Sequence, residues 1–154
     1  MPMHPPELVE IDPQHAITVR GDVPPDDLAA FFGPALSTAA AAAATAGVEL
    51  AGPPFGYYAE MSAETVVVEA GFPVAEAVAD LGDAHPLVLP GGRAVQTVHE
   101  GSYDTLQQTY AALEAWMAER GLHPASGPWE VYLTDPGTEP DPGRWQTRVV
   151  WPVG

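Results

Sequence analysis

The chain has 154 residues and contains neither cysteine nor lysine. The absence of cysteine excludes disulfide bonds, thiolate nucleophiles and cysteine-ligated zinc sites. The absence of lysine excludes enzymes that form a Schiff base with their substrate. The basic residues are therefore all arginines: Arg20, Arg93, Arg120, Arg144 and Arg148.

Positive charge is scarce, because five basic residues stand against 21 acidic ones and give a formal net charge of −16. Such a surface repels the phosphate backbone of nucleic acids, so we expect no direct nucleic-acid partner. The same field raises the local concentration of cations, which suits a cationic ligand. Solubility alone is the simpler explanation of the net charge.

Patterns typical of membrane and metal proteins are also absent from the sequence. No run of 18 apolar residues occurs and no leader segment is recognisable, so we expect a cytoplasmic protein without a membrane partner. The five histidines show no metal-ligand spacing. Gly91-Gly92 reads as a turn rather than a phosphate loop, because the lysine and helix of such a loop are missing. We expect no metal and no cofactor.

Hydrophobic periodicity and turn residues predict an alternation of strands and helices. The predicted helices cover residues 24–47 and 102–120, and glycines end both of them. The predicted strands cover residues 8–20 with an interruption at Asp12-Pro13, and residues 55–61, 65–70, 86–90, 93–99, 129–134 and 146–153. Strands 86–90 and 93–99 are predicted to pair around the Gly91-Gly92 turn.

Similar landmarks recur at similar spacing in the two halves of the chain. They are Gly21 and Gly101, Pro54 and Pro128, and Phe72-Pro73-Val74 and Trp151-Pro152-Val153. This self-similarity predicts one α+β domain, residues 1–154, built from duplicated β-α-β-β modules at about 7–75 and 86–154. We expect the modules to share an antiparallel sheet, with the two helices flanking a central ligand cleft. Chance similarity between two α/β halves is the alternative.

The most informative residue is Glu130, an acid in the middle of the apolar strand Trp129–Leu133. A buried carboxylate is costly unless a charged or hydrogen-bonding group answers it. That group is either a ligand or an internal arginine, and Arg148 and Arg93 are the candidates. Since alternate residues of a strand share a face, we expect Glu130 and Tyr132 to point the same way.

The repeat extends this candidate site to the first half of the chain. It aligns Gly56 with Glu130 and Tyr58 with Tyr132, so that aromatic faces and a carboxylate would receive a flat cation. Phe31 and Trp116, on the two helices, are further candidate ligand contacts. Each of these aromatic residues has a plain alternative, because aromatics at such positions are common in protein cores.

Several short motifs together resemble the GyrI-like small-molecule-binding family and the effector-binding domains of AraC-type and MerR-type multidrug regulators. The ordered set comprises Gly52–Phe55, Gly71–Val74, Leu89–Gly92, His99–Asp104, Trp129–Pro136 and Trp151–Val153. The resemblance implies paired β-α-β-β modules around a hydrophobic cleft, in which a glutamate on a late strand, here Glu130, receives cationic aromatic compounds. Regulators of that family carry a DNA-binding helix-turn-helix, whereas the first residues here already read as the first strand, so we expect a standalone form of the domain.

Three functions follow from the residues and the resemblance together. The first is the binding of hydrophobic, cationic aromatic compounds for sensing or sequestration. The second is hydrolysis of cyclopropane-bearing genotoxins or related strained electrophiles, with Glu130 as general base and Tyr132 as hydrogen-bond donor. The third is inhibition of a protein partner, as the founding type inhibits DNA gyrase. The sequence leaves open whether the chain is a monomer or a homodimer.

Overall fold

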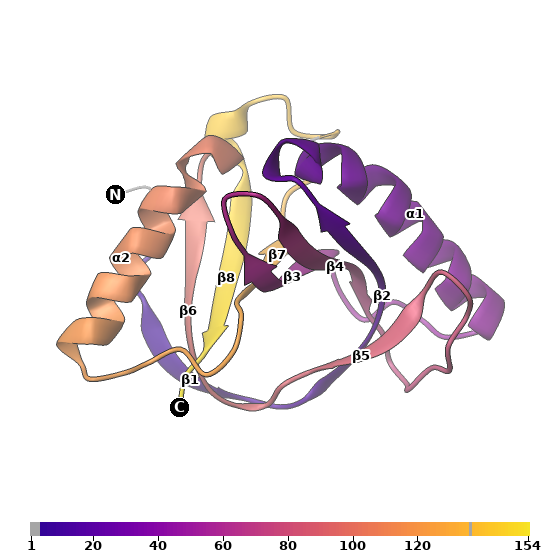
Figure 1. Cartoon of the computed structure of the whole chain (residues 1–154), viewed down its shortest axis with the longest axis horizontal. Coiled ribbons are helices and arrows are strands. Elements are labelled where there is room, and N and C mark those ends of the chain that lie inside the picture. Colours follow the sequence, from indigo (N-terminus) through magenta and orange to yellow (C-terminus); the bar gives the residue numbers. More distant parts are fainter. Residues whose placement is uncertain (1–3, 136) are drawn as a thin grey trace. The chain divides into compact units, whose positions relative to one another are not determined.

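A computed structural model describes residues 4–135 and 137–154 and divides the chain into two compact units (Figure 1). One unit contains the chain up to Ile11 together with Gly92–Gly154, and we call it the α2 unit. The other contains Asp12–Gly91, and we call it the α1 unit. The predicted α+β class is confirmed, since antiparallel strands and one long helix make up each unit.

In the α1 unit, helix α1 (Leu28–Ala46) packs on a sheet with the strand order β3-β4-β2-β5. The strands are β2 (Gln14–Val23), β3 (Phe55–Met61), β4 (Val66–Pro73) and β5 (His85–Leu89). A short 3-10 turn, Pro25–Asp27, leads into the helix, where proline and acids favour a helix start. Gly47 ends the helix in the left-handed conformation that favours glycine, with φ of 72°.

In the α2 unit, helix α2 (Leu106–Glu119) covers one face of a sheet with the order β1-β6-β8-β7. The strands are β1 (Glu7–Ile11), β6 (Gly92–Glu100), β7 (Trp129–Tyr132) and β8 (Gln146–Pro152). Tyr103–Thr105 forms a 3-10 turn before the helix, and Pro142–Arg144 forms another in the loop between β7 and β8. The apolar stripe of α2 packs on β6 and β8 through Leu113, Met117, Val95 and Val149.

Small side chains form the contact between α1 and its own sheet. Ala35, Ala39 and Ala43 are buried at intervals of four residues, which places them on one face of the helix. Residues Pro25–Ala46, with a mean hydropathy of 1.4, are the one segment of the described chain long and apolar enough to cross a membrane by length and composition. The core helix of a compact unit passes the same test, and the cytoplasmic location stays a prediction.

Two predicted strand arrangements are wrong. The segment 8–20 is not one strand, because β1 pairs with β6 while β2 pairs with β4 and β5. The expected hairpin of 86–90 with 93–99 does not form either, because β5 pairs with β2 and β6 pairs with β1. Each of these neighbouring strands finds a partner distant in sequence, which local turn residues do not encode.

The strand register gives a sharper comparison of the two units than the landmark residues do. Ala16 pairs with Pro73 and Ala94 pairs with Pro152, so positions 78 residues apart in β2 and β6 correspond (94 − 16 = 78). Gly21, opposite Val68, then corresponds to His99, opposite Thr147, rather than to Gly101. The first helical residues, Leu28 and Leu106, are also 78 apart (106 − 28 = 78).

Candidate functional site

Glu130 lies in β7 and is buried, with 7% of its surface exposed. Both of its carboxylate oxygens accept hydrogen bonds from tyrosines. The Tyr110 hydroxyl donates to Oε2 at 2.7 Å, and the Tyr132 hydroxyl donates to Oε1 at 3.0 Å. A buried carboxylate requires such donors, because desolvation without hydrogen bonds is costly.

Strand and helix periodicity bring these groups together. Glu130 and Tyr132 are two residues apart in β7 and point to the same face, as the sequence predicts. Glu130 lies opposite Val149 of β8, which belongs to the core beneath α2. Tyr110 projects from α2 toward the same face. The carboxylate is therefore enclosed between the strand that carries it and the helix that covers the sheet.

Three further aromatic rings, those of Tyr103, Trp145 and Trp151, pack against the two tyrosines that bind the carboxylate. The Tyr103 ring packs edge-on against Tyr132 at a centroid distance of 5.9 Å and lies 5.1 Å from the Trp145 ring. The Tyr110 ring meets the Trp151 ring edge-to-face at 5.6 Å. These spacings are typical of favourable aromatic pairs. The indole nitrogens donate to main-chain carbonyls, so each tryptophan is held at its polar edge.

The negative charge of Glu130 acts on the neighbouring Tyr103. Burial raises the pKa of the Tyr103 hydroxyl above its ordinary value, and the charges of Glu130 and Asp135 raise it further. Tyr103 nevertheless keeps 38% of its surface exposed. The site therefore joins a buried acid to a partly accessible aromatic ring, and its electrostatic field opposes additional negative charge.

The two arginines considered as internal partners of Glu130 are placed elsewhere. Arg148 lies opposite Val131, the residue next to Glu130 in β7. Since alternate residues of a strand point to opposite faces, the side chains of Arg148 and Glu130 lie on opposite faces of the sheet. Arg93 is exposed and pairs with Glu10. Along β6 it lies four residues from Thr97, which pairs with Val149, the residue opposite Glu130. At about 3.3 Å per residue this is a separation of roughly 13 Å along the strand.

The other predicted contacts fall into two groups. Tyr58 and Phe31 lie in the α1 unit, where they pack with Val66, Val68 and Phe32, and Gly56 is buried opposite Ala70 in the same unit. Trp116 packs against the core of the α2 unit, and the Arg120 guanidinium lies 3.9 Å from its ring centroid. The binding roles of these residues, and the predicted central cleft, stay predictions.

Sequence reasoning missed Tyr110, Tyr103, Trp145 and Trp151 as neighbours of the acid. Tyr110 fits the apolar stripe of α2, which explains its assignment to the core. The signal that identifies it is the 78-residue register, which matches Tyr110 with the helical aromatic Phe32. Ser102 and Tyr103 stand where a sequence reading places the cap of the helix that follows. No side-chain cap bond forms at Ser102, and the Tyr103 ring faces Tyr132 and Trp145 instead.

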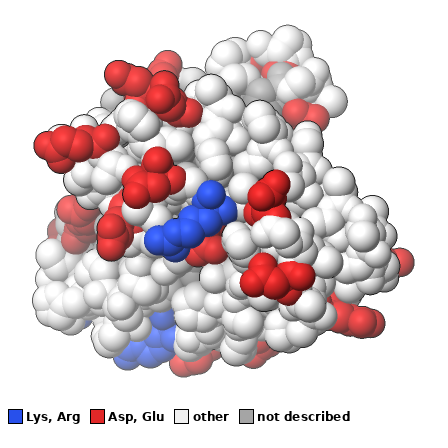
Figure 2. Space-filling view, turned by 45° about the vertical axis from the view of Figure 1, so that its right-hand side comes forward, with Lys and Arg blue, Asp and Glu red and all other residues white. Residues whose placement is uncertain are grey.

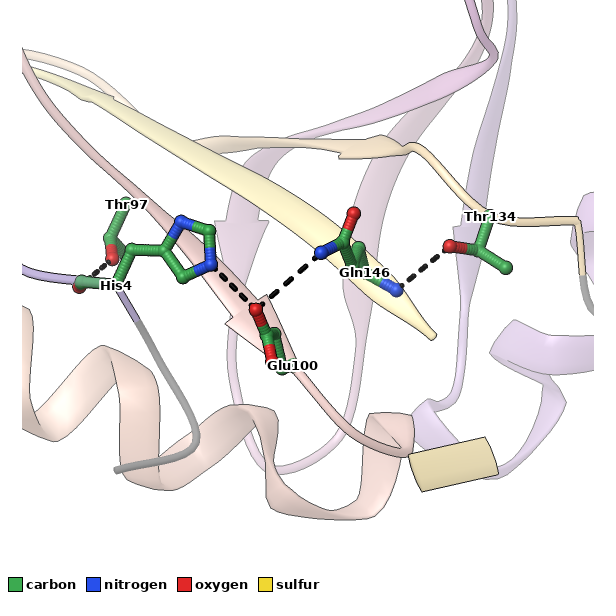
Figure 3. A network of polar contacts seen from close by, with 5 residues as sticks. All are labelled: His4, Thr97, Glu100, Thr134 and Gln146. Carbon is green, nitrogen blue, oxygen red and sulfur yellow. Dashed lines mark hydrogen bonds and ion pairs between the residues drawn. The ribbon is translucent and has the colours of Figure 1, made fainter. Parts of the chain in front are cut away.

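A second polar network lies apart from Glu130, at the edge of β6 (Figure 3). His4 Nε2 contacts Glu100 Oε1 at 2.6 Å, and the Gln146 side-chain amide donates to the same oxygen at 3.5 Å. The Thr97 hydroxyl donates to the His4 carbonyl at 2.5 Å. The hydrogen bond with His4 lowers the pKa of Glu100. These contacts hold the N-terminal segment against β6, which explains the network without a ligand.

The remaining acidic residues form no second candidate site. Figure 2 shows them spread over the visible face, with few basic residues among them. Within residues 4–135 and 137–154, no group of three or more histidine, aspartate and glutamate side chains is arranged to hold a metal ion. The Glu130 cluster is thus the place where a buried charge and several aromatic rings coincide.

The α+β fold places a buried acid among aromatic rings, an arrangement that suits the binding of a small molecule. The chain belongs to the GyrI-like small molecule binding domain family, whose model matches residues 4–154. The resemblance stated from the sequence motifs is therefore confirmed. A comparison with curated proteins found no match.

Solved structures of the same fold include regulator domains and stand-alone chains. The crystal structure of the EcmrR C-terminal domain is 24% identical, with a TM-score of 0.85 and coverage of 97% of each chain. In the EcmrR–DNA complex the match covers 99% of this chain but 58% of the longer EcmrR chain. A hydrolase from Listeria innocua is 18% identical, with a TM-score of 0.67 and coverage of 97% and 91%. SAV2435 bound to tetraphenylphosphonium is 12% identical, with a TM-score of 0.64 and coverage of 98% and 94%.

Proposed function

We propose that the chain binds hydrophobic cationic aromatic compounds, with Glu130 as the countercharge. The observation that carries the proposal is the buried Glu130 carboxylate, held by the hydroxyls of Tyr110 and Tyr132 and ringed by aromatic side chains. Sequestration or sensing of such compounds is the corresponding role.

The chemistry of this cluster suits a cation better than a neutral molecule. An ionised carboxylate attracts a cation strongly where water is excluded. Aromatic faces add roughly 0.5–2 kcal/mol each for a cation within about 6 Å of the ring. Tyr103 and Trp145 offer such faces beside Tyr132. A protein of the same fold, SAV2435, has been seen with tetraphenylphosphonium, a cation that carries four phenyl rings, which supports the ligand class.

The direct test compares two ligands of nearly the same shape. Methyltriphenylphosphonium and triphenylphosphine oxide differ chiefly in charge, since a methyl group replaces an oxygen. We expect the cation to bind with micromolar affinity and the neutral oxide at least tenfold more weakly, as measured by isothermal titration calorimetry. Equal affinity for both would show that the site selects shape alone and would refute the role of the charge.

A hydrolase is the second candidate function. Glu130 lies within hydrogen-bond distance of two phenol groups, which is the geometry of a general base beside hydrogen-bond donors. Turnover of a cyclopropane-bearing or other strained electrophile should then disappear in Glu130→Gln while binding of the substrate remains. Turnover that survives this substitution would exclude Glu130 as the base. The protein-inhibitor role stays a hypothesis, to be tested by retention of a partner in a pull-down.

A further inference from the structure

His99 in β6 is a fully buried polar residue outside the candidate binding site. Its Nε2 lies 3.0 Å from the Ser102 carbonyl oxygen and 3.0 Å from the Thr105 hydroxyl. Its Nδ1 lies 2.6 Å from the Thr109 hydroxyl. One imidazole therefore contacts three residues of the segment Ser102–Thr109, which contains the 3-10 turn and the start of α2.

These contacts define one arrangement of protons on the imidazole. A carbonyl oxygen only accepts, so Nε2 carries the proton and donates it toward Ser102. The neutral ring then accepts at Nδ1, and the Thr109 hydroxyl is the donor. The Thr105 hydroxyl donates to the Ser102 carbonyl at 3.0 Å, which orients that oxygen as well. Every polar atom of the buried ring is thereby satisfied.

The segment has no side-chain caps of its own. Ser102 precedes the 3-10 turn and Thr105 precedes α2, yet neither side chain makes a cap hydrogen bond to the helix that follows. Such caps usually fix the start of a helix. Gly101, with φ of 125°, makes the tight turn that brings Ser102 back over His99. The side-chain link between this segment and β6 is instead the His99 imidazole, through the Ser102 carbonyl and the Thr105 and Thr109 hydroxyls.

The segment carries two of the aromatic residues near Glu130. Tyr103 follows Ser102, and its ring packs against Tyr132 and Trp145. Tyr110 follows Thr109, and its hydroxyl donates to the Glu130 carboxylate at 2.7 Å. Two of the three residues that His99 contacts, Ser102 and Thr109, are thus immediate chain neighbours of residues of the candidate site.

The α1 unit builds the equivalent junction without a polar group. Gly21 occupies the position of His99 in the strand register, and Phe31, like Thr109, is the fourth residue of its helix. A Cβ added to Gly21 would lie 2.5 Å from the Phe31 ring, so this ring packs directly on the glycine backbone. A packed ring therefore suffices for the strand–helix junction of this fold. The hydrogen-bonded imidazole belongs to the unit that contains Glu130.

We infer that His99 is a positioning residue of the Glu130 site, which fixes Tyr103 and Tyr110 through Ser102 and Thr109 and thereby sets the affinity for the cation. The inference rests on the proposed function of that site. The hydrogen bonds of His99 to Ser102, Thr105 and Thr109 all lie in the segment that carries Tyr103 and Tyr110, so its effect on the site passes through that segment.

The test removes one hydrogen bond without changing the shape of the side chain. Thr109 is 1% exposed, and Thr109→Val replaces its hydroxyl by a methyl group, whereas Thr109→Ser keeps the hydroxyl. An unsatisfied buried Nδ1 is costly, so we expect Thr109→Val to weaken methyltriphenylphosphonium binding by roughly threefold to tenfold. Thr109→Ser should restore most of the affinity. Ile17→Val, in the core of the α1 unit, is the control for general loss of stability.

A second readout reports the position of Tyr103 without any ligand. In Thr109→Val the alkaline titration of Tyr103, followed by ultraviolet absorbance against Tyr103→Phe, should move toward that of a free tyrosine, because the ring loses its burial. Ile17→Val should leave this titration unchanged. If Thr109→Val lowers the unfolding temperature but alters neither affinity nor titration, His99 is structural only and the inference is overturned.

A double variant guards against loss of the fold. His99→Gly with Thr109→Phe transfers the glycine–phenylalanine junction of the α1 unit into the α2 unit, and it should fold while binding the cation more weakly. Full affinity in this folded variant would also overturn the inference. Failure of the proposed function is a separate result, in which the wild-type chain binds no cation. The affinity role of His99 then falls with it, while the Tyr103 titration still decides whether His99 holds the segment.

Discussion

Replacing Glu130 by glutamine separates the charge of the site from its shape. Glutamine keeps the length of the side chain and one acceptor oxygen for the Tyr110 and Tyr132 hydroxyls. A cation about 5 Å from the carboxylate, at an effective dielectric constant of about 20, interacts with it by about 3 kcal/mol. The empty site already compensates part of the carboxylate charge through two tyrosine hydrogen bonds. We therefore expect a loss of about 1.5–2.5 kcal/mol, or roughly ten- to seventyfold in affinity.

The assay is calorimetric titration of both chains with methyltriphenylphosphonium and with triphenylphosphine oxide. The neutral oxide should bind the variant at least as well as the wild type, because it has no positive charge for the carboxylate to attract and its phosphoryl oxygen can accept a hydrogen bond from a glutamine amide but not from a carboxylate. Glu100→Gln is the matched control, since it removes the same charge from an exposed residue elsewhere in the same unit. An equal loss of affinity for both ligands in Glu130→Gln, or an equal loss of cation affinity in Glu100→Gln, would refute the electrostatic reasoning.

The remaining predictions concern ionisation and backbone packing. Tyr103 should ionise above its ordinary pKa of 10.0. Its contribution to the stability of the fold is therefore complete below that pH and is lost as pH rises through the folded-state pKa. The free energy of unfolding at about pH 9–12, compared with that of Tyr103→Phe, measures this loss. Gly71→Ala should destabilise the fold by about 3 kcal/mol or more, because its Cβ would lie 1.9 Å from the Ile17 carbonyl oxygen. Gly33→Ala, in open space on α1, should change the stability by no more than about 1 kcal/mol, because the helix propensity of alanine opposes the clash of its Cβ with the following Pro34. Denaturant unfolding measures both, and equal effects would contradict the packing argument.

Local patterns in the sequence predict the elements well and their pairing less well. Both helices and the 55–61 and 65–70 hairpin follow from periodicity and turn residues, which act over a few positions. The partners of β1 and β5 lie far away in sequence. Nothing near Gly91-Gly92 therefore indicates that β5 and β6, the strands on either side of this turn, do not pair with each other. Pairing of distant strands depends on the whole sheet.

The same distinction applies to the candidate site. The shared face of Glu130 and Tyr132 follows from the two-residue period of a strand, and the structure confirms it. The contact of Tyr110 with Glu130 depends on how α2 lies across the sheet, which the helical stripe alone does not specify. The three contacts of His99 with the segment Ser102–Thr109 become apparent only in three dimensions.

The position of a bound cation tests the central claim most directly. In a crystal structure of the chain with methyltriphenylphosphonium, we expect the phosphorus atom within roughly 6 Å of the Glu130 carboxylate, with phenyl groups against the Tyr103 and Trp145 rings. A cation bound away from Glu130, or a Glu130 carboxylate joined to an arginine while the cation is bound, would contradict it.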